Sequence, residues 1–514
     1  MLFNSVEFIV FFLPVVLVGF YLLLLRDAQR AALLWLLVTS LVFYGVWNPP
    51  YLILIAISIG FNYWAGHVVA RGERYRKVLL GLAIAANLIL LGYYKYANFF
   101  ISNLSALTGT TGTLEGIILP LGISFYTFTQ IAFIVDAYKH RSTRHSLMSY
   151  ALFVLFFPHL IAGPIVHHWD LVPQLVKRKA ASDFWRNFAI GMTCFVMGMF
   201  KKVALADAIS PYAIRAFGAA DSGVALSFFE AWGGALAYTF QLYFDFSGYS
   251  DMAIGLGIMF GVNLPVNFYS PYKSVNIIDF WRRWHMTLSQ FLRDYLYIPL
   301  GGNRKGRSRR YVNLMVTMVL GGLWHGAGWN FILWGALHGS YLVINHGWQA
   351  ITGHLFPGPR RSSIVGRWAG RLLTFLCVVV AWVFFRATTF NGAVSMLAGM
   401  AGLNQILVPA SVVSLLKKLT GLGEGLPVAT YGLVNFGSMQ GFVLIAALAA
   451  IAFFFPNTSE LVRESPAPGW EEKDSPVRRL TWSPNVAWAA IILVCFAYSL
   501  LQLSTISEFL YYQF

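Results

Sequence analysis

The stretch LGGLWHGAGWNFILWGALHG, residues 320–339, joins two apolar segments through a glycine-containing break and places His325 at that break. Similar apolar runs recur along nearly the whole chain, and each is close to the roughly 20 residues that a helix needs to cross a bilayer. The 514 residues are 58% hydrophobic and only 11% charged, whereas about a quarter of the residues in a soluble globular protein are charged. The sequence therefore predicts a polytopic membrane protein built from spanning helices.

Basic residues form short clusters between the apolar runs, a pattern that indicates membrane topology and argues against a nucleic-acid partner. The formal net charge is +16, but the basic residues form no single stripe. The first run, residues 6–25, has no basic segment before it and no cleavage site after it, so we expect a spanning helix and no removable signal peptide. Arg26 and Arg30 follow this run, and the positive-inside rule then places the N-terminus outside the cytoplasm.

Two apolar stretches depart from a simple spanning helix. Residues 148–168 are interrupted by two prolines and a glycine and are followed by basic residues, so we expect a re-entrant segment that returns to the cytoplasmic side. The stretch 241–262 contains Asp245 and Asp251. Carboxylates inside a membrane usually face a bundle interior or a water-filled cavity. We interpret these two as structural, each paired with a buried arginine or a backbone amide.

The apolar runs become regular in the last part of the chain. They lie near residues 311–324, 328–347, 372–386, 437–455 and 482–503. The sequence shows no internal repeat and no separate soluble domain. We therefore expect a single integral membrane domain over residues 1–514. Its predicted parts are N-terminal helices in 1–140, a core with re-entrant and interfacial helices and the histidine motifs in 141–350, and C-terminal helices in 351–514.

A helical pattern extends over residues 279–297 and is rich in aromatic and basic residues. Its apolar residues share one broad face, and an adjacent narrow stripe contains Arg282, His285, Ser289 and Arg293. The aspartate that begins the pattern is expected to cap the helix. An interfacial helix on anionic lipid headgroups would account for the arginines. It would not require a histidine within the stripe.

His325 is a candidate for chemistry. A lone histidine in a membrane span is often structural, but ionisable residues at membrane depth are costly and tend to mark functional paths. No adjacent nucleophile and no metal-binding spacing such as HExxH accompanies His325, so no metal site is predicted. A neutral imidazole can act alone as a general base that takes a proton from a hydroxyl attacking an acyl carbonyl. His338, which lies about 140° from His325 around a continuous helix, is interpreted as a packing residue.

Several long motifs resemble the membrane-bound O-acyltransferase (MBOAT) family, and most closely its bacterial alginate O-acetyltransferase branch. The motifs that carry the resemblance are LPLGISFYTFTQIAFIVDAY (119–138), FWRRWHMTLSQFLRDYLYIPLGG (280–302) and the stretch 320–339. Shorter stretches of the same type are MLFNSVEFIVFFLP (1–14), YYKYANFF (93–100), FFPHLIAGPIV (156–166), WVFFRA (382–387) and FFFPNTSE (453–460). The resemblance implies an all-α polytopic membrane protein, with a multi-helix bundle around a central tunnel and with re-entrant and interfacial helices.

The resemblance also implies roles for individual residues. His325 stands in the family's signature histidine position and His285 in its second histidine position, so both are predicted catalytic residues. An acyl group would enter from the cytoplasmic side and leave toward the periplasm. Acetyl-CoA is the expected donor, and Arg282, Arg283 and Arg293 would bind its phosphates through charge-assisted hydrogen bonds.

Three further residues are expected beside the substrate. Trp324 would form the wall next to the imidazole of His325, and Ser289 shares the polar stripe of His285. Asn330 would either orient a ligand or satisfy a backbone group, and the sequence favours neither. No bound cofactor is expected besides the acyl donor.

The final acceptor and the partners are expectations from the same resemblance. Relatives in this branch work with periplasmic or membrane-anchored acetyltransferase partners that modify alginate, cellulose or peptidoglycan. We therefore expect such a partner in the bacterial inner membrane or periplasm, together with polysaccharide synthesis and export machinery and membrane lipids. Two alternatives stay open: D-alanyl transfer from a carrier protein to a cell-envelope polymer, as in a sister branch, and a transporter or export scaffold without chemistry.

Overall fold

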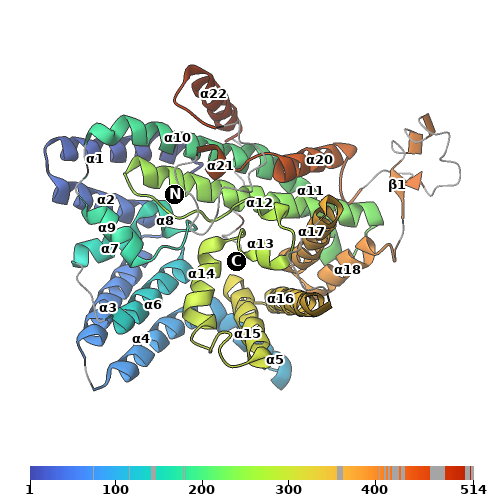
Figure 1. Ribbon diagram of the computed structural model, residues 1–514, viewed down its shortest axis with the longest axis horizontal. Coiled ribbons are helices and arrows are strands. Elements are labelled where there is room, and N and C mark those ends of the chain that lie inside the picture. The colour runs from blue at the N-terminus through green and yellow to red at the C-terminus, as the bar shows by residue number, and fades with distance from the viewer. Residues whose placement is uncertain are drawn as a thin grey trace. The chain divides into compact units, whose positions relative to one another are not determined.

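Helices make up nearly all of the regular structure in this computed structural model (Figure 1). It describes residues 1–514 except 73, 111, 115, 141–145, 178, 180, 356–362, 405, 410–412, 415–416, 419–427, 430–433, 463–480, 504–509 and 511–514. Within the described residues, the strands are β1 (Val408–Pro409) and β2 (Val428–Ala429), which pair in parallel. The predicted all-α fold class is confirmed.

The chain forms two compact units. The first comprises Met1–Phe200, Gly248–Asn267 and Thr458–Gln513. Its helices are, in chain order, η1 (Glu7–Phe12), α1 (Leu13–Leu25), α2 (Gln29–Gly45), α3 (Tyr51–Arg71), α4 (Arg76–Leu91), η2 (Gly92–Tyr96), α5 (Ala97–Thr108), α6 (Ile123–His140), α7 (Leu147–Leu155), α8 (Phe157–Leu160), α9 (His168–Val176), η3 (Ala181–Asp183), α10 (Phe184–Phe200), α21 (Thr458–Val462) and α22 (Val486–Leu501).

The second unit comprises Lys201–Ser247 and Phe268–Asn457. Its helices are η4 (Lys201–Ala206), α11 (Asp207–Asp221), η5 (Pro271–Lys273), α13 (Ile277–Trp281), α14 (Met286–Leu292), η6 (Arg293–Tyr297), α15 (Arg307–His325), α16 (Trp329–Leu355), α17 (Ile364–Arg386), α18 (Phe390–Met400) and α20 (Met439–Phe454). The long helix α12 (Phe228–Met259) contributes residues to both units. The single domain and its three predicted parts stay a prediction.

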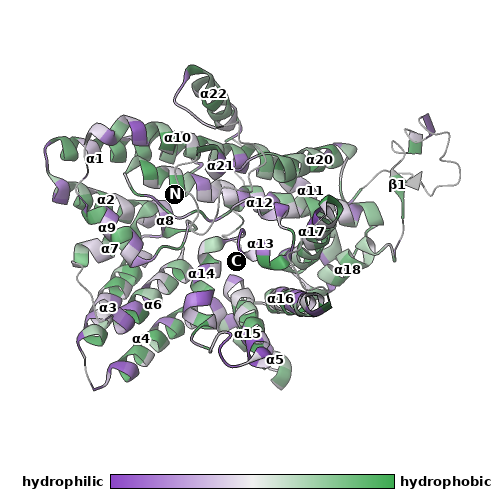
Figure 2. Cartoon of the chain, viewed as in Figure 1, coloured by the Kyte–Doolittle hydropathy of each residue, from purple (hydrophilic) through white to green (hydrophobic). Residues whose placement is uncertain are grey.

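Five helical segments of the described chain are long and apolar enough to span a bilayer. They are Glu7–Leu25, Tyr51–Arg71, Arg76–Thr108, Phe184–Asp221 and Ile364–Arg386. Figure 2 shows hydrophobic residues over most of the helices, whereas hydrophilic residues gather where α14 leads into α15. The chain is therefore a multi-pass membrane protein, and the first apolar run forms a helix of spanning length as predicted.

The stretch 148–168 is a broken helix, as its prolines and glycine predict. Helix α7 begins after Ser146, whose hydroxyl oxygen accepts a hydrogen bond from the backbone N–H of Ser149. It ends at Leu155, because the next residue, Phe156, has a non-helical ψ of 104°. The chain then forms the single turn of α8. A side chain at Gly163 would overlap the backbone of His159, so this turn requires glycine. The break is confirmed, and its return to the cytoplasmic side stays a prediction.

Helices α15 and α16 pack side by side as a hairpin, joined by residues 326–328 (Figure 1). Glycines allow this close approach. A Cβ atom at Gly322 would overlap the carbonyl oxygen of Phe331, and a Cβ atom at Gly335 would overlap the carbonyl oxygen of Met318. The short connection leaves His325 at the end of α15, where a small shift of either helix would move its imidazole.

Candidate active site

His325 is the last residue of α15 and is buried, with 6% of its surface exposed. The helix stops because the next residue, Gly326, has an extended backbone with φ −159° and ψ 151°. Three aromatic rings surround the imidazole, with centroid distances of 4.9 Å to Trp324, 5.1 Å to Trp334 and 5.2 Å to Phe385. The backbone break and these rings together fix where the imidazole lies.

His285 lies beside His325 in the same unit. The centroids of the two imidazole rings are 6.4 Å apart and their planes are inclined by 59°. His285 is 1% exposed. Its ring packs edge-to-face against the ring of Phe246, with the two centroids 4.8 Å apart. Its centroid is also 6.4 Å from that of Trp324. The structure thus brings together the two histidines that the sequence singled out.

The continuous helix predicted for residues 279–297 is wrong. Helix α13 ends at Trp281, α14 begins at Met286, and the π-helical turn η6 follows. The break falls at His285, whose φ of 42° and ψ of 54° lie in the left-handed region. That conformation is uncommon for residues other than glycine, and a 3.6-residue pattern carries no sign of it. The break turns His285 into the interior.

The aspartate cap and the polar stripe predicted for this segment are also wrong. Asn276 caps α13, because its side-chain oxygen accepts a hydrogen bond from the backbone N–H of Asp279 at 2.9 Å. The stripe does not form, since His285 is buried while Arg282 and Arg293 are exposed. Glycines 301 and 302 have positive φ values of 112° and 54° and lie in the turns that follow the helical segment.

The predicted substrate-binding residues around His285 differ in their surroundings. Arg283 donates a hydrogen bond to the Asp279 carboxylate at 2.8 Å. Arg293 donates to the neighbouring Asp294 carboxylate at 2.7 Å, and this contact raises the pKa of the Arg293 guanidinium. The hydroxyl of Ser289 donates to the carbonyl oxygen of Trp281 at 3.0 Å. These three residues therefore already bind parts of their own segment.

Two predicted residues lie on the helical hairpin. Trp324 is buried beside His325, with 3% of its surface exposed, in the wall position that the sequence suggested. Asn330 donates a hydrogen bond from its side-chain amide to the carbonyl oxygen of Ala387 at 2.8 Å. Of the two roles left open for Asn330, this contact shows the structural one, and it joins the start of α16 to the end of α17.

His338 is fully buried among aromatic rings. Its centroid lies 4.8 Å from that of Trp334 and 5.1 Å from that of Trp281. Within the part of the chain that the structure describes, neither ring nitrogen of His338 has a hydrogen-bond partner. This environment fits the packing role that the sequence analysis gave it.

The carboxylate of Asp245 forms a buried ion pair. The amino nitrogen of Lys202 lies 2.7 Å from the carboxylate of Asp245 and 2.7 Å from that of Asp207. The side chains of Lys202 and Asp245 are each 2% exposed. The structural interpretation of Asp245 is therefore supported, although its partner is a lysine and not the expected arginine or backbone amide.

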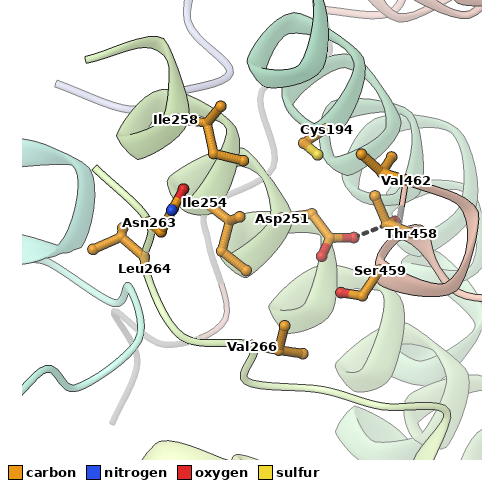
Figure 3. Close-up of a pocket in the computed structure, with 10 residues that line it drawn as sticks. All are labelled: Cys194, Asp251, Ile254, Ile258, Asn263, Leu264, Val266, Thr458, Ser459 and Val462. Atoms are coloured by element: carbon orange, nitrogen blue, oxygen red, sulfur yellow. Dashed lines mark hydrogen bonds between the residues drawn. The ribbon is translucent and has the colours of Figure 1, made fainter. Parts of the chain in front are cut away.

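The carboxylate of Asp251, in the first unit, accepts a hydrogen bond from the Thr458 hydroxyl at 2.6 Å (Figure 3). The two residues line a pocket of about 30 Å³ together with Cys194 and Ser459. This small space and the hydroxyl partner fit a structural role for Asp251. Its partner again differs from the one expected.

The segment that holds both histidines lies within a recognised protein family. The family model of the membrane-bound O-acyltransferases matches residues 94–385, which include both histidines and the rings around them. The chain belongs to the membrane-bound O-acyltransferase family. It is thus an integral membrane O-acyltransferase, and the alternative of a scaffold without chemistry is set aside.

Curated relatives support the same family and branch. The peptidoglycan O-acetyltransferase of Helicobacter pylori is 43% identical over 436 residues, which cover 79% of this chain and 81% of the relative. The probable alginate O-acetylase of Pseudomonas putida is 41% identical, and its alignment covers 100% of both chains. The teichoic acid D-alanyltransferase of Streptococcus thermophilus is 29% identical over 52% of this chain and 68% of its own length. The predicted resemblance to the alginate O-acetyltransferase branch is confirmed.

Part of the aromatic wall of this acyltransferase was not predicted from its sequence. Phe246, Trp334 and Phe385 contact the two histidines, and they come from three separate helices. Phe385 lies in WVFFRA, one of the stretches that carry the family resemblance, so that stretch was the available signal. Which of its rings faces His325 depends on packing between distant segments.

Proposed function

We propose that this acyltransferase moves an acetyl group from cytoplasmic acetyl-CoA across the bacterial inner membrane for the O-acetylation of an exported polysaccharide. The observation behind the proposal is the pairing of His285 with His325 in a buried aromatic site. The full-length similarity to a probable alginate O-acetylase supports acetyl as the group and a polysaccharide as its destination. An alginate-like or cellulose-like polymer is the proposed substrate class.

The proposed chemistry is general base catalysis. His325 takes the proton of an acceptor hydroxyl while that oxygen bonds to the thioester carbonyl carbon, and the carbon–sulfur bond then breaks to release the CoA thiolate. His285, 6.4 Å away between ring centroids, hydrogen-bonds to the acyl group held between the two rings. Positioned proton transfer of this kind contributes typically about 10²–10⁴-fold to a rate.

The donor is proposed to approach along the segment that carries His285. Arg282 is exposed, and Arg293 has 59% of its side chain exposed, so both can meet the phosphates of acetyl-CoA. Charge-assisted hydrogen bonds to phosphate are stronger than neutral ones. Both Arg283 and Arg293 pair with a carboxylate, but Arg283 has the weaker case because only 12% of its side chain is exposed.

The acceptor is proposed to be reached through a second protein. A periplasmic or membrane-anchored acetyltransferase would receive the acetyl group and pass it to the polymer, alongside the polysaccharide synthesis and export machinery. The N-terminus would face the periplasm, because Arg26 and Arg30 follow the first span and basic loops favour the cytoplasmic side.

The test is transfer of labelled acetyl from acetyl-CoA by the purified protein, with and without its periplasmic partner. Wild type is compared with His325→Ala and with His354→Ala, an exposed histidine near the end of α16 that serves as the control. We expect label to leave CoA in wild type and in the control, and not in His325→Ala. Equal turnover by all three proteins would refute the role of His325. If wild type did not turn over acetyl-CoA with the partner present, acetyl-CoA would be the wrong donor. Carrier-bound D-alanine would be tested next.

A further inference from the structure

Two hollows in the first unit share Tyr21 in their linings. One is an apolar groove of about 590 Å³, lined by side chains of α1 and α10 such as Leu17, Val18, Phe188 and Met192. The other is a polar cavity of about 530 Å³ beside the C-terminal end of α1. Tyr21 lines both, and Figure 1 shows α1 and α10 side by side.

Tyr21 marks the boundary between the apolar and the polar hollow. Its hydroxyl donates a hydrogen bond to the carbonyl oxygen of Met259 at 2.8 Å, and its ring packs edge-on against Phe184 at 4.7 Å. Tyrosine is enriched where a membrane protein passes from hydrocarbon to the headgroup level. The apolar lining of the groove suits a hydrocarbon chain, and the polar lining of the cavity suits a lipid headgroup.

The polar cavity carries an excess of positive charge. Among the described residues that line it, Lys177, Lys179 and Arg186 are basic and Asp183 is the one acidic residue. Burial lowers the pKa of the Lys179 amino group to about 8, and the charge of Lys177 adds to this effect. A phosphate in the cavity would favour the charged form of Lys179.

The basic segment is held in place by side-chain hydrogen bonds. The Gln29 amide donates to the carbonyl oxygen of Lys177 at 3.2 Å and accepts from the backbone N–H of Lys179 at 3.2 Å. The amino group of Lys179 donates to the carbonyl oxygen of Gly261 at 2.6 Å. Because the cationic cavity is already ordered, less conformational entropy is lost when a ligand binds.

We propose that the first unit binds one anionic phospholipid, with its phosphate in the basic cavity and an acyl chain in the groove between α1 and α10. Charge complementarity selects an anionic headgroup over a zwitterionic one, since Lys177, Lys179 and Arg186 line the cavity and basic residues attract anionic lipids. The two hollows share Tyr21 in their linings, so one molecule with a phosphate and a hydrocarbon chain fits both, which favours a lipid over a free phosphate compound. This site is separate from the proposed acetyl transfer and does not depend on it.

The test uses the full chain, stripped of lipid in a neutral detergent and titrated with phosphatidylglycerol or with phosphatidylcholine of the same acyl chains. Native mass spectrometry counts the bound lipids. The headgroup variant is Lys177→Gln with Arg186→Gln, and its control removes two exposed arginines elsewhere, Arg71→Gln with Arg74→Gln. We expect the headgroup variant, which loses two positive charges, to lose roughly 30-fold in affinity for phosphatidylglycerol, and the control to lose none.

The apolar groove is tested with a second variant and a matched control variant. Met192→Trp fills the apolar groove, whereas Ile89→Trp places the same ring on α4 at a residue that is 71% exposed. We expect only Met192→Trp to weaken phosphatidylglycerol binding, with unchanged thermal melting of the lipid-free protein. Equal binding of the two lipids would overturn the proposal. It would also fail if glycerol phosphate or CoA displaced the lipid from wild type while Met192→Trp had no effect, because the cavity would then bind soluble phosphate compounds.

Discussion

The imidazoles of His285 and His325 lie 6.4 Å apart between centroids, and each is placed by a break in a helix. His325 ends α15, and His285 adopts a left-handed conformation immediately before α14. A left-handed non-glycine residue is held only where the surroundings stabilise it. The site therefore depends on two backbone breaks, and its geometry is sensitive to the packing of α14, α15 and α16.

The two histidines should act as one unit in acyl transfer. His285→Ala and His325→Ala should each slow the transfer by about 10²–10⁴-fold. The double variant should be no slower than the slower single variant, because groups that act in one step show non-additive losses. The measurement is the rate of labelled acetyl transfer for all four proteins. Losses that multiply in the double variant would show that the histidines act independently.

The close contact of α15 with α16 should tolerate no added methyl group. Gly322→Ala should lower stability by about 1–3 kcal/mol through overpacking, since its Cβ would overlap the carbonyl oxygen of Phe331. It should also slow acyl transfer by displacing His325. Thermal melting in detergent and the transfer rate check both effects.

Gly353→Ala on α16 is the matched control for this change, because an added Cβ there meets no atom within 4 Å. We expect an unchanged transfer rate and a melting temperature that stays equal or rises, as alanine favours a helix over glycine by up to about 1 kcal/mol. If the two alanine variants melted alike, close packing at Gly322 would not be needed.

Much of the fold could be predicted because membrane helices follow from local composition. The run at residues 6–25 became the helix Glu7–Leu25, and the prolines and glycine in 148–168 marked a real break. Each of these features is decided by hydrophobic length or by residues that cannot continue a helix.

The site could be predicted only in part. His325 stood out because a histidine beside glycines in an apolar stretch is rare. The break at His285 was missed, since its left-handed backbone depends on surrounding packing that no period reveals. The contacts of Phe246 and Phe385 with the histidines were missed for a related reason. They join segments that are distant in sequence, so they follow from tertiary packing and not from local pattern.

The buried ion pair should be needed for stability. Asp245→Asn would leave Lys202 with one fewer charged partner in an environment where both side chains are 2% exposed. Breaking a buried pair from one side costs about 3–5 kcal/mol, so we expect a large fall in melting temperature. Asp207→Asn is the comparison, and it should cost less because the Asp207 side chain is 13% exposed. Equal melting of Asp245→Asn and wild type would show that the pair is not structural.

The amino group of Lys179 should lose its proton at a lower pH than an ordinary lysine. Its pKa is lowered from 10.5 to about 8, first by burial and then by the charge of Lys177. The unfolded chain therefore binds more protons than the folded one between these two values, and the contribution of Lys179 to stability should rise with pH across that window. Below the window the cost of burying the charged amine is fully present.

Pulsed acetylation of lysines, followed by mass spectrometry across neutral to alkaline pH, measures this titration directly. Labelling of Lys179 should reach half its maximum near pH 8 in the folded protein and near pH 10.5 after denaturation. Added phosphatidylglycerol should move the folded midpoint upward, because a nearby phosphate stabilises the charged amine. Coincident curves for folded and denatured protein would contradict the burial of this lysine, and an unmoved midpoint with the anionic lipid would count against the phosphate lying beside it.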